Sequence, residues 1–218
     1  VNEAPTDLSL SANTVAENVA NGTVIGTVSG TDPDAGDTKT YSFTDSAGGR
    51  FAIDSATGVI TVADGSLLDY EAATSHTVIV RVTDAGGLTY DETFTINLTN
   101  VNEAPTDLSL SSNTVAEHAS NGTAVGVVTA SDADAGETFT YQLTDDAGGR
   151  FVVNPTTGEI TVADGSLLHY EVASSHDVTV RVTDSGGLAY DETFTINLTD
   201  VNEAPTDLSL SANTVAEN

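Results

Sequence analysis

The chain has 218 residues, with 33 Asp and Glu against 5 Lys and Arg, a formal net charge of −28, and no Cys. This negative charge repels nucleic-acid phosphates and anionic lipid head groups, so we expect no nucleic-acid partner and no membrane insertion. The lack of Cys excludes disulfides and Cys-ligated zinc. The sequence contains neither a long apolar window nor a basic leader, so it predicts no membrane span and no signal peptide.

The sequence is an internal repeat. Residues 1–100 and 101–200 align without a gap and are identical at 70 positions, and residues 201–218 repeat residues 1–18 letter for letter. A repeat of this length is a whole domain, so the pattern predicts an array of similar modules. We expect module 1 over 1–100, module 2 over 101–200, and the linker and first strand of a truncated third module over 201–218, all within a longer array.

Alternation of apolar and polar residues predicts β-strands throughout each repeat. Val78, Val80 and Val82 alternate with polar or outward-facing neighbours, and so do Phe94, Ile96 and Leu98. In chain order the first repeat predicts strands over 7–16, 23–30, 39–44, 51–53, 59–63, 77–83 and 93–99.

Turn-forming residues separate these strands, and no stretch shows the period of a full helix; a single turn is expected around 66–72. Seven short strands at this spacing predict a Greek-key β-sandwich. The fold class expected is therefore all-β, with two tandem seven-stranded modules. The link between them is short, is centred on Asn102 and is fixed by Pro105, so we expect a defined geometry and not a flexible tether.

Acidic and amide side chains recur at loop positions of the first repeat, often as DxD or DxE pairs. They are Glu17, Asp32, Asp34, Asp69, Glu71, Asp84, Asn100, Asn102 and Glu103. Ca²⁺ takes six to eight oxygen ligands in tolerant geometry, whereas Mg²⁺ prefers fewer carboxylates and retained water. The residues therefore point to calcium, although Asp and Gly are also ordinary turn residues.

Six motifs resemble the cadherin repeat in the form found in large, type I secreted bacterial surface adhesins. They are VAEN at 15–18, DPDAG at 32–36, FAIDSATGVITV at 51–62, LDYE at 68–71, VTDAGG at 82–87 and NVNEAP at 100–105. The resemblance covers nearly the whole chain and implies an extracellular or cell-surface protein, neighbouring modules of the same chain as partners, and Ca²⁺ bound between consecutive modules.

Carried over by position, the resemblance implies one complete calcium junction and two half-junctions. The complete junction takes Glu17, Asp69 and Glu71 from module 1, Asn100, Asn102 and Glu103 from the linker, and Asp132, Asp134 and Asp184 from module 2. The N-terminal half-junction takes Asn2, Glu3, Asp32, Asp34 and Asp84. The C-terminal half-junction takes Glu117, Glu171, Asp200, Asn202 and Glu203.

Two departures from the family pattern have consequences. His169 stands where module 1 has Asp69, and imidazole is a poor Ca²⁺ ligand, so we expect weaker calcium binding after module 2. The chain has no Trp, so adhesion by exchange of an N-terminal Trp is not expected. His76 and His176, which open a strand in each repeat, are expected to be packed or solvated.

Several other functions are set aside. The loop that begins at Asp32 lacks the Glu required at position twelve of an EF-hand, because Phe43 stands there. Paired carboxylates also occur in glycosidases, but no aromatic cleft is evident, and we expect no enzyme. Two hypotheses remain: spacer modules of a surface adhesin, stiffened by calcium, and modules that themselves bind polysaccharide or another cadherin-like module in a calcium-dependent way.

Overall fold

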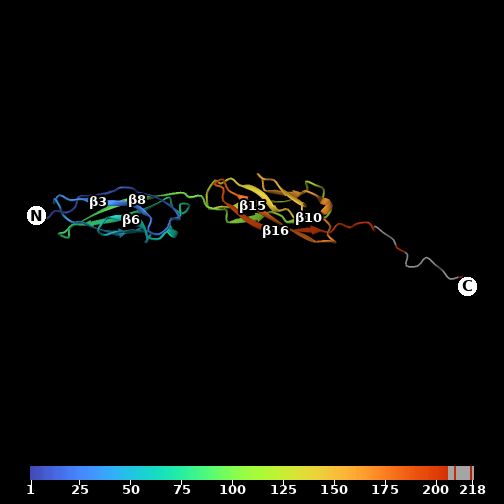
Figure 1. Cartoon of the computed structure of the whole chain (residues 1–218), viewed down its shortest axis with the longest axis horizontal. Coiled ribbons are helices and arrows are strands. Elements are labelled where there is room, and N and C mark those ends of the chain that lie inside the picture. The colour runs from blue at the N-terminus through green and yellow to red at the C-terminus, as the bar shows by residue number, and fades with distance from the viewer. Residues whose placement is uncertain (206–208, 210–216, 218) are drawn as a thin grey trace. The chain divides into compact units, whose positions relative to one another are not determined.

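The computed structural model describes residues 1–205, 209 and 217. They form two compact units that divide between Asn102 and Glu103, and each unit carries the same order of elements (Figure 1). The strand expected at the start of a third module lies almost entirely outside the described residues. Among the described residues the helices are single 3₁₀ turns, and none is long and apolar enough to cross a membrane.

The first unit contains short strands and one 3₁₀ turn. They are β1 (Asp7–Leu10), β2 (Thr14–Ala16), β3 (Val24–Thr31), β4 (Thr40–Asp45), β5 (Phe51–Ile53), β6 (Val59–Val62), η1 (Gly65–Leu67), β7 (Ser75–Thr83) and β8 (Thr89–Thr99).

The second unit repeats them. They are β9 (Asp107–Leu110), β10 (Thr114–Ala116), β11 (Ala124–Ser131), β12 (Thr140–Asp145), β13 (Phe151–Val153), β14 (Glu159–Val162), η2 (Gly165–Leu167), β15 (Ser175–Thr183) and β16 (Ala189–Thr199).

Each unit is a sandwich of two four-stranded sheets. In the first unit the sheet orders are β1-β3-β6-β5 and β2-β8-β7-β4; in the second they are β9-β11-β14-β13 and β10-β16-β15-β12. Neighbouring strands are antiparallel except for β2 with β8 and β10 with β16, which are parallel. The predicted all-β sandwich class is confirmed.

The core lies between the two sheets and follows the alternation in the sequence. Val78, Val80 and Val82 on β7 are completely buried, as is Ile96 on β8. The opposite sheet contributes Ile60, which is also completely buried. Burying side chains of this kind stabilises a fold by roughly 1.5–3 kcal/mol each, so one unit has a core of its own.

The first predicted strand, 7–16, is wrong as a single element because the chain changes sheets within it. Residues 7–10 pair with β3 in one sheet, and residues 14–16 pair with β8 in the other. Gly26 makes the change possible, since a Cβ there would collide with the backbone of Ala12. Each unit therefore has eight described strand segments where seven were expected.

Candidate metal centre

At the C-terminal end of the first unit, a buried carboxylate holds two chain segments together. Glu17 follows β2 and is only 2% exposed. Its Oε2 accepts a hydrogen bond from the backbone N–H of Tyr70 at 2.6 Å, and its Oε1 accepts one from Val101 at 2.9 Å. Carboxylate oxygens of Glu17, Asp69 and Glu71 lie within 4.8 Å of one another. The structure thus brings together the three ligands predicted from module 1.

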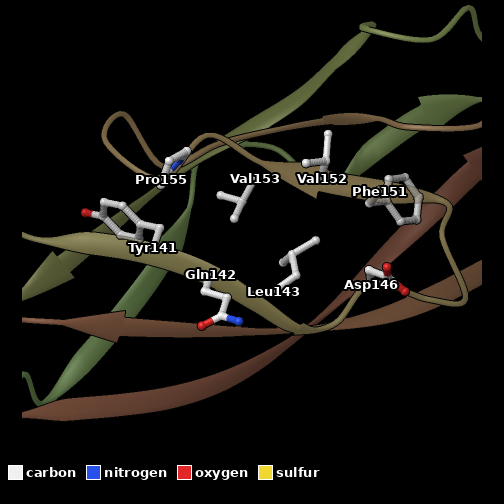
Figure 2. A pocket seen from close by; sticks show the side chains of 8 residues that line it. All are labelled: Tyr141, Gln142, Leu143, Asp146, Phe151, Val152, Val153 and Pro155. Atoms are coloured by element: carbon white, nitrogen blue, oxygen red, sulfur yellow. The ribbon is translucent and has the colours of Figure 1, made fainter.

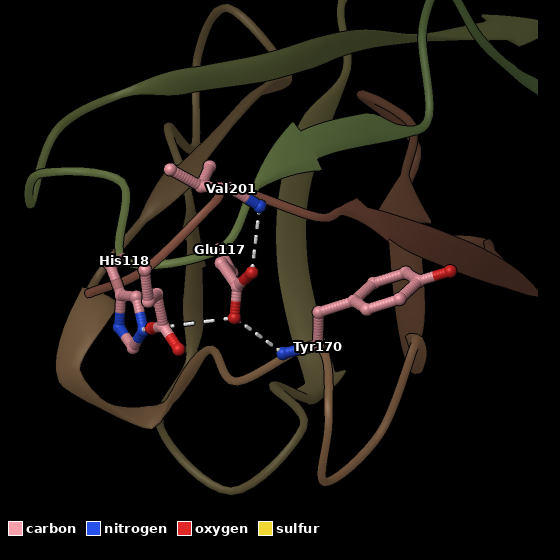
Figure 3. Close-up of polar contacts among 5 residues, drawn as sticks. Glu117, His118, Tyr170 and Val201 are labelled. Atoms are coloured by element: carbon pink, nitrogen blue, oxygen red, sulfur yellow. Dashed lines mark hydrogen bonds and ion pairs between the residues drawn. The ribbon is translucent and has the colours of Figure 1, made fainter. Parts of the chain in front are cut away.

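The second unit repeats this arrangement around Glu117 (Figure 3). Its carboxylate accepts hydrogen bonds of 2.8 Å from the backbone N–H groups of Val201 and Tyr170. These donors hold the pKa of the Glu117 carboxyl below its usual value, because they stabilise the charged form. Oxygens of Glu117, Glu171 and Asp200, all predicted ligands, lie within 4.8 Å of one another.

Histidines change the chemistry of this end. His118 Nε2 lies 2.6 Å from Oε1 of Glu203 and 3.7 Å from Oε2 of Glu117. His169, at the position of Asp69 in the first unit, places its ring centroid 4.7 Å from that of His118. The ligand atoms of Glu117, His118 and Glu203 also lie within 4.8 Å of one another.

The N-terminal end of the first unit carries the DxD loop and the predicted Asn2 and Glu3. Asp84, 6% exposed, accepts a hydrogen bond of 2.9 Å from Asn2 Nδ2. The backbone N–H of Glu3 donates to Asp34 Oδ2 at 2.7 Å, and that of Asp34 donates to Asp32 Oδ1 at 2.8 Å. The five predicted residues therefore form two hydrogen-bonded sets, and carboxylate oxygens of Asp32 and Asp84 bring the two sets within 4.8 Å of each other.

In the second unit the same loops are arranged alike. The N–H of Glu103 donates to Asp134 Oδ2 at 2.7 Å, and the N–H of Asp134 donates to Asp132 Oδ1 at 3.0 Å. Asp134 and Asp184 are each 6% exposed, and Asp184 Oδ1 accepts the N–H of Leu188 at 2.8 Å.

Several carboxylate oxygens of these loops are buried and lack a hydrogen-bond partner. They are Oδ2 of Asp32, Oδ2 of Asp132 and Oδ1 of Asp134. Burying an anionic oxygen without a partner is costly, and a bound cation removes that cost. Because every predicted donor at these two loops is a carboxylate or amide oxygen, the residues fit Ca²⁺.

The remaining predicted ligands lie in the segments that leave the last strands. Asn100 and Asn202 are exposed after β8 and β16, and Asn102 is half-buried.

Sequence reasoning missed Asp37, which the structure groups with Asp32 and Asp84. The available signal was the third carboxylate of the DPDAGD loop, which extends the DxD pair. In the second unit Glu137 takes this position, where its Oε2 accepts a 2.6 Å hydrogen bond from the Ser185 hydroxyl. Sequence reasoning also missed His118, whose equivalent in the first unit is Asn18.

A family model described as the cadherin domain matches residues 12–99 and 111–199. The chain belongs to the cadherin family. It is similar to the protocadherin-like wing polarity protein stan of Drosophila melanogaster, with 35% identity over 204 residues, covering 87% of this chain and 6% of that protein. It is also similar to human protocadherin Fat 4, with 33% identity over 177 residues, covering 77% of this chain and 4% of that protein.

Solved cadherin structures agree with this assignment. Mouse cadherin-23 EC22-24 superposes with a TM-score of 0.66 at 26% identity, over 89% of this chain and 67% of that one. Human protocadherin-24 EC1-2 gives a TM-score of 0.72 at 20% identity, over 93% of this chain and all of that one, and supports the fold alone.

Cadherin domains are adhesion modules and not enzymes, and they bind calcium at the linkers between domains. The cadherin relatives named here are eukaryotic. The chain spans only 4–6% of the length of these curated relatives.

A pocket of about 300 Å³ opens in the second cadherin domain between edge strands β12 and β13 (Figure 2). Leu143, Val152, Val153 and Pro155 contribute most of its apolar lining, together with Tyr141 and Phe151, which are 9% and 2% exposed. Sugar rings stack on exposed aromatic faces, and neither of these rings offers one. The pocket therefore lends no support to the polysaccharide-binding hypothesis.

Proposed function

We propose that the chain is a pair of extracellular spacer modules of a large cell-surface adhesin, stiffened by calcium bound at the module ends. The adhesin that this proposal envisages is of the bacterial, repeat-rich type whose motifs the sequence resembles. The observation that carries the calcium part is the set of buried carboxylate oxygens without partners on Asp32, Asp132 and Asp134.

Charge balance supports this proposal. The chain carries a net charge of −28, and like charges gathered at the ends of a compact module repel one another. Divalent cations relieve this repulsion only where several carboxylates converge, as those of Glu17, Asp69 and Glu71 do. The assigned ligands of consecutive modules would then share ions through the linker, as in other cadherins.

The near-identity of the repeats supports a spacer role. The two modules share their strand order and most of the predicted ligand residues, with His169 in place of Asp69 and Asp200 in place of Asn100 as the exceptions. A module whose task is to add length needs no individual binding surface. Adhesion then belongs to a distal part of the longer protein, and the partners of these modules are their neighbours in the same chain.

Calcium removal tests the proposal. Calcium that binds the folded modules stabilises them by RT ln(1 + [L]/Kd), about 3 kcal/mol at a hundredfold excess over Kd. We expect EDTA to lower the melting temperature of the 218-residue chain and to change its maximum dimension in X-ray solution scattering. Unchanged values of both would refute calcium stiffening.

Matched variants assign the ligands. Asp134→Asn should weaken calcium binding strongly, because it removes charge from a carboxylate with a buried, unpaired oxygen. Asp107→Asn, an exposed position on β9 with the same charge change, is the control. His169→Asp, which restores the residue of the first module, should strengthen calcium binding at the end of the second. Equal affinities in all three variants would contradict the ligand assignment.

A further inference from the structure

The C-terminal end of the second unit places two imidazoles beside a carboxylate. His118 Nε2 lies 2.6 Å from Glu203 Oε1, and the His118 and His169 rings meet edge to face at an interplanar angle of 75°. The side chains of His118 and Glu203 are 39% and 49% exposed. The cluster is thus open to ions from solvent, and all three residues belong to one unit.

The first unit carries oxygen donors at both histidine positions. Asn18 stands at the position of His118 and Asp69 at that of His169. Asn18 and His118 share a left-handed backbone, with φ of 54° and 53°, a conformation in which Asn and His are both enriched. The backbone is therefore conserved between the units, while two oxygen donors are exchanged for two nitrogen donors.

We propose that His118, His169 and Glu203 form a binding site for a divalent transition-metal ion of the zinc class. Imidazole nitrogen binds Zn²⁺, Cu²⁺ and Ni²⁺ well and Ca²⁺ poorly, since calcium requires hard oxygen ligands. Two nitrogen atoms and one carboxylate oxygen are a known ligand set for zinc, with water at the fourth position. The C-terminal ends of the two units thus select different metals.

Ligand atoms of His118 and Glu203 lie within 4.8 Å of each other and of Glu117, whereas His169 is placed by its ring alone and must turn a nitrogen toward the ion. Imidazoles on one tetrahedral zinc, at Zn–N distances of about 2.0–2.1 Å, have ring centroids about 5 Å apart, close to the 4.7 Å between His118 and His169. Two donor atoms on the same ion lie about 3.3 Å apart, so the 2.6 Å contact between His118 and Glu203 widens by about 0.7 Å when the metal replaces the proton between them.

Zinc titration of the full chain, stripped of metal and then saturated with calcium, tests the site. We expect isothermal titration calorimetry to find one Zn²⁺ per chain with the affinity dependent on the histidines. The double variant His118→Asn, His169→Asp should weaken binding at least about tenfold. It carries the residues that the first unit already has at these positions, so it is expected to fold. His76→Gln removes an imidazole elsewhere and should leave zinc affinity unchanged.

Imidazole resonances in ¹H–¹⁵N NMR give a second measurement. Zinc should shift the ring nitrogens of His118 and His169 and leave those of His76 and His176 in place. The inference is overturned if no zinc binds at about 0.1 mM, if the double variant binds zinc equally well, or if zinc shifts the resonances of the other two histidines instead. Because calcium is held constant, failure here leaves the calcium-dependent melting temperature as a separate test of the spacer function.

Discussion

Glu17→Gln tests how much a buried carboxylate contributes to the first unit without metal. Glu17 is 2% exposed and accepts backbone hydrogen bonds from Tyr70 at 2.6 Å and Val101 at 2.9 Å. Each hydrogen bond to a charged group contributes about 1.5–3 kcal/mol. Glutamine keeps one acceptor oxygen but presents an N–H donor to the other backbone N–H, so one bond is lost outright.

An opposing effect reduces this cost. Neutralising Glu17 relieves its repulsion with the carboxylates of Asp69 and Glu71, an effect that solvent around these two exposed partners weakens. The hydrogen bonds therefore dominate. We expect the free energy of unfolding of the first unit to fall by about 2 kcal/mol, or its melting temperature by about 8–16 °C, since 1 kcal/mol shifts a domain of this size by about 4–8 °C.

Calorimetry in EDTA provides the measurement, with the transition of the second unit as an internal reference. Asp7→Asn, an exposed substitution on β1 with the same charge change, serves as control and should leave both transitions in place. If the two variants melt together, the buried hydrogen bonds of Glu17 do not hold this end of the unit, and the reasoning fails.

Three further variants address the first unit. Burial lowers the pKa of His76 below its ordinary value of about 6.5. The unfolded chain therefore takes up the proton first, so stability present above about pH 6.5 is lost as the pH falls. In urea unfolding, His76→Gln should make the free energy of unfolding depend less on pH between about 7.5 and about 5.5, one unit either side of the ordinary pKa. Gly65→Ala places a Cβ against the carbonyl oxygen of Val19 and should cost about 1–3 kcal/mol in the same assay; unchanged stability would show that the loop yields freely. Arg81→Ala breaks an exposed bidentate ion pair and should leave the melting temperature nearly unchanged, because exposed pairs contribute little.

Local alternation was sufficient to predict most strands. Val78, Val80 and Val82 identify the inward face of β7 without any knowledge of its neighbours, and residues 51–53 were predicted with the bounds that β5 has. The predicted strands 77–83 and 93–99 were too short, since β7 begins at Ser75 and β8 at Thr89. Polar residues near the N-terminal ends of these long strands obscure the alternation of apolar and polar residues there.

Contacts between residues far apart in the sequence determine the features that local alternation does not predict. The change of sheet near Ala12 depends on Gly26, and the alternation of 7–16 contains no sign of it. The spacing of Glu17, Asp69 and Glu71 in the sequence does not indicate that they lie close together. The family resemblance implies it. His118 and His169 lie 51 positions apart in the sequence, so only the folded turns after β10 and η2 show that their rings meet.

The parallel pairing of β2 with β8 has a mechanical consequence. β2 lies near the start of the first unit and β8 ends it, and Thr14, Val15 and Ala16 lie opposite Asn97, Leu98 and Thr99 in register. When tension pulls the two chain ends apart, parallel neighbours slide against each other, so their hydrogen bonds bear the load together instead of opening one at a time. The change of sheet that creates β2 thus gives each unit a shear clamp between its entry and exit strands.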